Sequence, residues 1–137
     1  MIMSFKVGDK KVITIPITEK MVQLFAEMSG DYNPVHMDEE YAKTTRFGRR
    51  IAHGMLSGAL ISRALAMELG PGGIYLSQEL KFANPIFIGD TVEVQLEVVM
   101  YKESKGIGKI ETIVRKTTGE VCVKGEAMIQ RGDFVKA

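Results

Sequence analysis

Residues 54–69, GMLSGALISRALAMEL, place apolar side chains around most of the circumference of a helix. A surface helix is usually apolar along one stripe only, so this segment is expected to be enclosed by other parts of the chain. Gly70 and Pro71 follow it directly and predict its end. The fold must therefore supply a cover for one central helix.

The chain after this helix is expected to be almost entirely β-strand. Four segments carry strand-forming residues separated by turn residues, namely 73–82, 90–103, 106–117 and 121–131. In the second of them Val92, Val94, Leu96 and Val98 alternate with polar residues and are predicted to face the core. Residues 5–18 are expected to add a short hairpin that turns at Gly8 and Asp9. Long consecutive antiparallel strands with one apolar helix favour an α+β domain in which a curved sheet wraps that helix.

The chain has 137 residues, and residues 1–137 are expected to form a single domain with no linker or internal repeat. Its formal charge of +1 offers no case for nucleic acid or a membrane surface as partner. The longest apolar run is too short to span a bilayer, and no signal peptide is recognised. Cys122 is the single cysteine, which excludes an intrachain disulfide and suits a reducing compartment. We expect a cytoplasmic protein.

The stretch SGDYNPVHMDEEYA, residues 29–42, sets an acid and a base on either side of a kink. A helix capped by Thr18 is expected to stop at Gly30, so Asp31 follows a helix end. Pro34 is expected to hold Asn33 extended and to delay the next helix until Asp38 caps it. Residues five apart do not share a helical face, so only a bend can bring Asp31 and His36 together.

This stretch carries a motif that resembles one known family. The motif is Gly-Asp-x-Asn-Pro-x-His with a small residue six positions later, met by Gly30, Asp31, Asn33, Pro34, His36 and Ala42. Together with RRIAHGMLSGALIS and IYLSQELKFANPIFIGDTV, it resembles the MaoC-like hydratases, particularly the (R)-specific enoyl-CoA hydratases, over nearly the whole chain. The resemblance implies a hot dog fold with an overhanging helical elbow. It also implies a homodimer, or a higher oligomer, with thioester sites near the subunit interface.

Hydration of a 2-enoyl thioester needs a base for water, an acid for the α-carbon and donors for the enolate oxygen. Asp31 and His36 supply two titratable groups, which the kink can turn toward one water. The alternative is that Asp31 only caps a turn and that His36 is only a packed polar residue. Gly54 opens the apolar helix, so its backbone N–H can face the enolate, unless it only fits a tight helix start.

Other polar residues are assigned supporting parts. His53 is expected to anchor a hydrogen bond, and Asn33 to brace the elbow through its amide, although Asn before Pro is also a common turn residue. Ser62 matches a pocket serine of the family, or only bonds back to its helix.

The arginines are considered as contacts for coenzyme A and the histidines as metal ligands. Arg46, Arg49 and Arg50 are candidates for the coenzyme A phosphates or are solvated surface charge. Two histidines 17 residues apart without a cysteine pair predict no metal site. No separate cofactor is expected, because coenzyme A is part of the substrate.

Three functions are open at this stage. The first is an (R)-specific enoyl-CoA hydratase, a lyase, or a 3-hydroxyacyl-carrier-protein dehydratase that runs the same step backwards. The second is a hot dog acyl-CoA thioesterase, whose water attacks the carbonyl carbon instead. The third is an acyl-thioester binding module without turnover. The Asp31–His36 motif favours the first.

Overall fold

The computed structural model describes residues 5–136. Its elements in chain order are β1 (Lys10–Pro16), α1 (Glu19–Ser29), α2 (Pro34–Met37), α3 (Glu39–Lys43), α4 (Gly54–Ala64), a π-helical turn η1 (Leu65–Leu69), β2 (Ile74–Phe82), β3 (Thr91–Lys102), β4 (Ile107–Lys116), β5 (Val121–Gln130) and α5 (Gly132–Val135). None of the helices within these residues has the length and hydropathy to cross a bilayer.

The five strands form one antiparallel sheet in the order β1-β3-β4-β5-β2. Strands β3, β4 and β5 pair with their neighbours in sequence, whereas β2 lies at the far edge beside β5. The predicted alternation in β3 is confirmed, since Val92, Val94 and Val98 are fully buried. Their side chains point inward and form part of the sheet side of the hydrophobic core.

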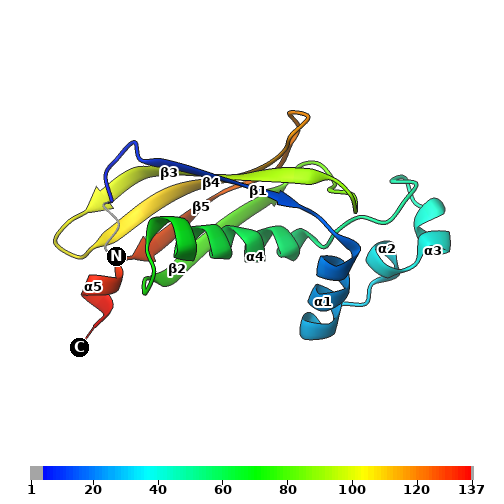
Figure 1. The fold of residues 1–137 in the computed structure, drawn as a ribbon, viewed down its shortest axis with the longest axis horizontal. Coiled ribbons are helices and arrows are strands. Elements are labelled where there is room, and N and C mark those ends of the chain that lie inside the picture. Colours follow the sequence, from blue (N-terminus) through cyan, green and yellow to red (C-terminus); the bar gives the residue numbers. More distant parts are fainter. Residues whose placement is uncertain (1–4, 137) are drawn as a thin grey trace.

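Helix α4 lies beneath this sheet along its length (Figure 1). It contacts β2, β3 and β4, and buries Leu56, Leu60 and Ile61 against them. This is the α+β arrangement of a hot dog fold, as predicted. The opposite side of the helical segment is not covered, because Met55 and Met67 are 59% and 66% exposed. One chain therefore leaves one side of its apolar helix uncovered.

The predicted hairpin over residues 5–18 is wrong. Only β1 is a strand, and it pairs with β3 rather than with the residues before it. Phe5 instead enters the core, where its ring stacks on that of Tyr101 at a centroid distance of 5.7 Å. The long β3 offers β1 a complete ladder, so a local partner is not needed.

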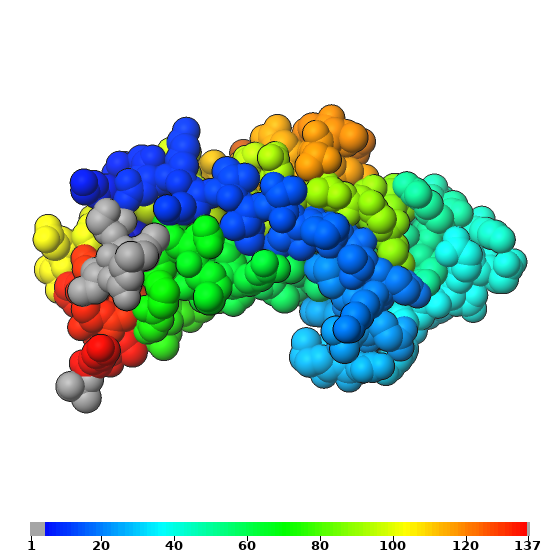
Figure 2. All heavy atoms as spheres, viewed as in Figure 1, coloured from blue at the N-terminus to red at the C-terminus, as the bar shows by residue number. Residues whose placement is uncertain are grey.

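Helices α1, α2 and α3 form an elbow that projects beyond the end of the sheet (Figure 1). Thr18 caps α1 by accepting a hydrogen bond from the Met21 N–H, and Gly30 ends it with a positive φ of 78°, as predicted. Figure 2 shows the surface hollowed between α1 and α4.

The expectation that Pro34 delays the next helix is wrong, because a short helix begins at this residue, although Asn33 before it is non-helical with φ −50° and ψ 125°. Asn33 caps that helix, and its Oδ1 accepts from the Val35 N–H. Proline is well tolerated at the first helical position, where its missing N–H would have no partner. The predicted cap at Asp38 is confirmed.

Candidate active site

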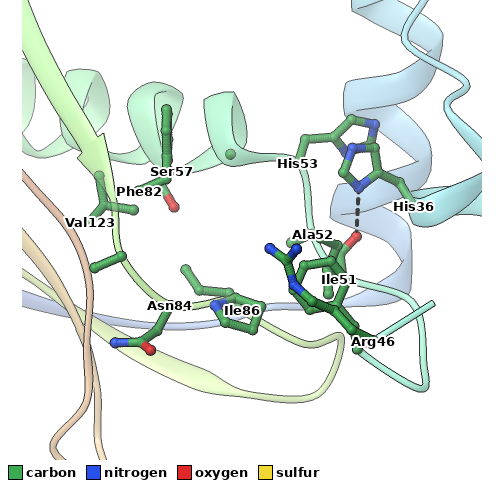
Figure 3. Close-up of a pocket in the computed structure, with 14 residues that line it drawn as sticks. His36, Arg46, Ile51, Ala52, His53, Ser57, Phe82, Asn84, Ile86 and Val123 are labelled. Atoms are coloured by element: carbon green, nitrogen blue, oxygen red, sulfur yellow. Dashed lines mark hydrogen bonds between the residues drawn. The ribbon is translucent and has the colours of Figure 1, made fainter. Parts of the chain in front are cut away.

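A pocket of about 330 Å³ lies where the elbow, the start of α4 and the end of β2 meet. Figure 3 shows the side chains around it. It is lined by His36, Arg46, Phe47, Ile51, Ala52, His53, Gly54, Ser57, Phe82, Ala83, Asn84, Pro85, Ile86 and Val123. The two histidines, 17 residues apart in sequence, therefore share one cavity.

The two histidine rings are held in contact by backbone carbonyls. Nδ1 of His36 lies 2.8 Å from the carbonyl oxygen of Ile51, and Nε2 of His53 lies 2.9 Å from that of Asp31. The ring centroids are 4.1 Å apart. A carbonyl only accepts, so Nδ1 carries the hydrogen in neutral His36 and Nε2 is left as an acceptor. His36 therefore presents a basic nitrogen.

The environment keeps His36 neutral. Burial is the largest influence and lowers its pKa below the ordinary 6.5, with nearby His53 and Arg50 acting in the same direction. The hydrogen bond to Ile51 and the Asp31 carboxylate oppose this shift but do not cancel it. At neutral pH the ring is therefore able to accept a proton.

Asp31 lies beside the two histidines. Each of Asp31, His36 and His53 places one potential ligand atom within 4.8 Å of those of the other two. The Asp31 carboxylate is exposed and accepts from the Asn33 N–H at 3.2 Å. The kink between Asp31 and His36 thus brings an acid and a base to one place, which a continuous helix would not do.

A close approach by the side chain of Phe82 favours glycine at position 54. A Cβ on Gly54 would lie 2.9 Å from the ring of Phe82, on β2. The Leu56 N–H donates to the carbonyl of the N-cap residue His53 at 3.1 Å, so the N–H groups of Gly54 and Met55 are the ones left without a helical partner at the positive dipole end. Gly54 therefore opens the pocket to these donors.

Ser57 is a pocket residue that sequence reasoning did not identify. It is buried in the first turn of α4, three positions after Gly54, and lines the cavity. The sequence signal for Ser57 was a hydroxyl side chain in the first turn of a helix. This N-terminal end of α4 is the end that faces the pocket.

The chain matches the family model described as "MaoC like domain" over residues 6–121. The chain belongs to the MaoC-like family. It is 40% identical over 128 residues to the (R)-specific enoyl-CoA hydratase of Aeromonas caviae, covering 93% of this chain and 96% of that protein. It is 42% identical over 125 residues to the enzyme of the same name from Rhodospirillum rubrum, covering 90% and 86%. The solved R-hydratase PhaJ1 from Pseudomonas aeruginosa has a TM-score of 0.87 and 50% identity, covering 92% and 81%.

This MaoC-like chain does not bring Ser62 into the same pocket. Ser62 lines a separate hollow of about 90 Å³ between η1, the start of β2 and the end of β5. Within one chain, Ser62 is therefore set apart from the two histidines. Asn33 also lies outside the pocket lining, and its amide oxygen braces the start of α2.

The three arginines of the MaoC-like chain are placed differently. Arg46 is exposed and lines the pocket. Arg49 lies over the ring of Phe87 at 4.0 Å, outside the pocket lining. Arg50 points inward and is occupied by hydrogen bonds to the chain. Of the three, only Arg46 lies at the pocket.

The Asp31, His36 and His53 cluster could hold a transition metal ion, since imidazole and carboxylate are suitable ligands. The prediction of no metal site relied on the separation of the histidines in sequence, and this separation is not kept in space. Nδ1 of His53 is buried and has no hydrogen-bond partner among residues 5–136.

The lowered pKa of His36 predicts how stability depends on pH in this MaoC-like chain. The folded pKa lies below the unfolded 6.5, so between the two values the unfolded chain binds more protons. His36 has no such effect on the free energy of unfolding at high pH, where its ring is neutral in both states. The stability falls as the pH drops through 6.5 toward the pKa of His36 in the folded chain. We expect Tm to fall more between about pH 7.5 and about pH 5.5 in wild type than in His36→Gln. Equal falls in thermal melts would contradict this.

Proposed function

We propose that this MaoC-like protein is an (R)-specific enoyl-CoA hydratase, a hydro-lyase that adds water reversibly to trans-2-enoyl thioesters. The observation that carries the proposal is that Asp31 lies beside His36, a residue of the pocket lining whose Nε2 atom is left as an acceptor. Relatives named for this activity match along nearly the whole chain.

Asp31 and His36 hold the reacting water in this proposal. The water oxygen bonds to C3 of the thioester while one of its protons passes to Nε2 of His36. The Asp31–His36 pair returns a proton to C2, so water is divided between the two carbons and the product is the (3R)-hydroxyacyl thioester. A neutral His36 suits this task, because a protonated ring could not take a proton from water.

The enolate that develops on the thioester oxygen needs donors aimed at the pocket. The backbone N–H of Gly54 at the start of α4 is the donor we propose, with the hydroxyl of Ser57 beside it. His53 holds the elbow against α4 by donating to the Asp31 carbonyl. This hydrogen bond keeps the enolate donors of α4 and the Asp31–His36 pair in fixed positions relative to each other.

The substrate class is an acyl-CoA or acyl-carrier-protein thioester. Arg46 stands at the pocket, exposed, where a phosphate of coenzyme A or of a carrier's prosthetic arm can reach it. We place the enzyme in the cytoplasm, where the lone buried Cys122 remains reduced.

We propose that the protein is a homodimer joined at the β2 edge of the sheet. The two edges differ: β1 carries Lys10, Lys11 and Pro16, which discourage pairing with another strand. On β2, in contrast, Ile74, Leu76 and Phe82 are between 45% and 55% exposed. This apolar edge adjoins the uncovered side of α4, so a second chain would complete the enclosure of the helix.

Leu76→Arg should therefore prevent dimer formation, because it places a charge on the proposed interface. Val12→Arg is the matched control: Val12 lies on β1 at the other edge and is 53% exposed, similar to the 47% of Leu76. Sedimentation should give about 30 kDa, twice the chain mass of 15.2 kDa, for wild type and Val12→Arg, and the mass of one chain for Leu76→Arg. An active wild-type monomer would rule out the dimer.

The function is tested by following enoyl absorbance and free thiol together on crotonyl-CoA and longer enoyl-CoAs. A hydratase removes the absorbance without releasing coenzyme A. A thioesterase would release the thiol, and a binding module would change neither signal.

A further inference from the structure

We propose that Arg50 is a positioning residue that fixes His36 in its catalytic orientation, by tying the backbone of α2 to the start of α1 through Glu19. The inference rests on the function proposed above. It differs from the role of phosphate contact that sequence reasoning considered for Arg50.

The contacts of Arg50 are directed into the chain. Its Nε donates to the His36 carbonyl at 2.6 Å, and a terminal nitrogen donates to Glu19 Oε1 at 2.8 Å. The Arg50 side chain is only 14% exposed, whereas that of Glu19 is 58% exposed. Nε and one terminal nitrogen of the guanidinium are thus occupied, and little of the side chain is exposed to a ligand in solvent.

The segment that contains Arg50 holds His36 from two directions. Arg50 holds the backbone carbonyl of His36, while the next residue, Ile51, accepts from the ring Nδ1 at 2.8 Å. The Ile51 N–H also donates to the Val35 carbonyl at 3.2 Å. Three hydrogen bonds therefore lock α2 to residues 50–51, and a shift of this segment moves the catalytic ring.

Arginine is suited to this task because its planar fork reaches two acceptors in fixed directions. A lysine carries the same charge on a single nitrogen, so it cannot reproduce both contacts. The ion pair with Glu19, 31 residues away in sequence, extends the support to the N-terminal end of α1. Glu19 belongs to the outer part of this arrangement, since most of its carboxylate is in water.

The test compares Arg50→Gln, Arg50→Lys and Glu19→Gln with Arg46→Gln, which removes an arginine that does line the pocket. Misplacement of a catalytic group by about 1 Å can cost roughly 10²-fold in rate. We expect Arg50→Gln to lower kcat by about 10- to 100-fold with KM nearly unchanged. Arg50→Lys should restore only part of this loss, and Glu19→Gln should lose less than Arg50→Gln. Arg46→Gln should instead raise KM and leave kcat unchanged, as for a contact made equally in ground and transition states.

A second readout separates positioning from general loss of structure and does not need turnover. Imidazole NMR of wild type should show His36 as the Nδ1–H tautomer, held by the Ile51 carbonyl, and Arg50→Gln should populate both tautomers. Arg46→Gln should keep the wild-type signal. If Arg50→Gln fails to fold, Glu19→Gln and Arg50→Lys carry the same test, with smaller changes of the same direction.

The outcomes are distinguishable. A raised KM with unchanged kcat and tautomer in Arg50→Gln would overturn the proposal and make Arg50 a thioester contact. No change in any readout would overturn it as well. If wild type does not hydrate enoyl-CoA at all, the proposed function fails, and the tautomer measurement alone decides whether Arg50 positions His36.

Discussion

Asp31→Asn and His36→Gln should each lower kcat by about 10²- to 10⁴-fold and change KM little. Each substitution keeps the size of the side chain but removes a group that exchanges a proton with water or with C2. Asn can still accept the Asn33 N–H that Asp31 accepts now, so the elbow should keep its shape. The measurement is steady-state hydration of an enoyl-CoA.

The double variant tests whether the two groups act as a unit. Because both are proposed to hold one water, it should fall little below the weaker single variant, whereas multiplied losses would indicate separate tasks. Asp38→Asn is the matched control. Asp38 is also an elbow carboxylate, but it caps α3 and does not belong to the cluster of Asp31, His36 and His53, and asparagine caps equally well. Near-normal rates in folded Asp31→Asn and His36→Gln would refute the assignment.

Gly125→Ala should strongly destabilise the fold. A Cβ at this position of β5 would lie 1.7 Å from the backbone carbonyl oxygen of Glu79 in β2. This backbone oxygen cannot move away without breaking the pairing of β2 with β5. Strand β2 also carries Phe82, which lines the pocket. We expect a loss on the order of 3 kcal/mol, near the upper range for overpacking, and a fall in Tm of roughly 10 °C.

Gly70→Ala is the control for the loss of a glycine as such. A Cβ there meets no heavy atom within 4 Å, and the φ of −171° is open to any residue. Thermal melts of the two variants should therefore differ widely. A Gly125→Ala protein with the same Tm as wild type would show that β2 does not approach β5 as closely as described.

The main elements were predictable from sequence because their signals are local. The alternation along β3 and the apolar circumference of residues 54–69 identify a sheet and its central helix without any knowledge of distant contacts. The hairpin prediction failed because the partner of β1 is β3, far along the chain.

The candidate site was predictable to the extent that a motif marks it. Asp31, His36, His53 and Gly54 do gather at one place, although their roles remain predictions. Ser57 was missed because its only signal is its position in the first turn of α4. The direction of Arg50 depends on Glu19 and on the His36 carbonyl, and no local pattern reveals such partners.

The central claim, an (R)-specific hydratase, is tested most directly by running the reaction backwards on two pure enantiomers. The protein is mixed separately with (3R)- and (3S)-3-hydroxybutyryl-CoA, and the appearance of enoyl absorbance is followed. The account predicts dehydration of the (3R) thioester alone, without release of free coenzyme A, and loss of this reaction in His36→Gln. Formation of enoyl-CoA from the (3S) thioester, or release of free thiol in place of enoyl absorbance, would contradict it.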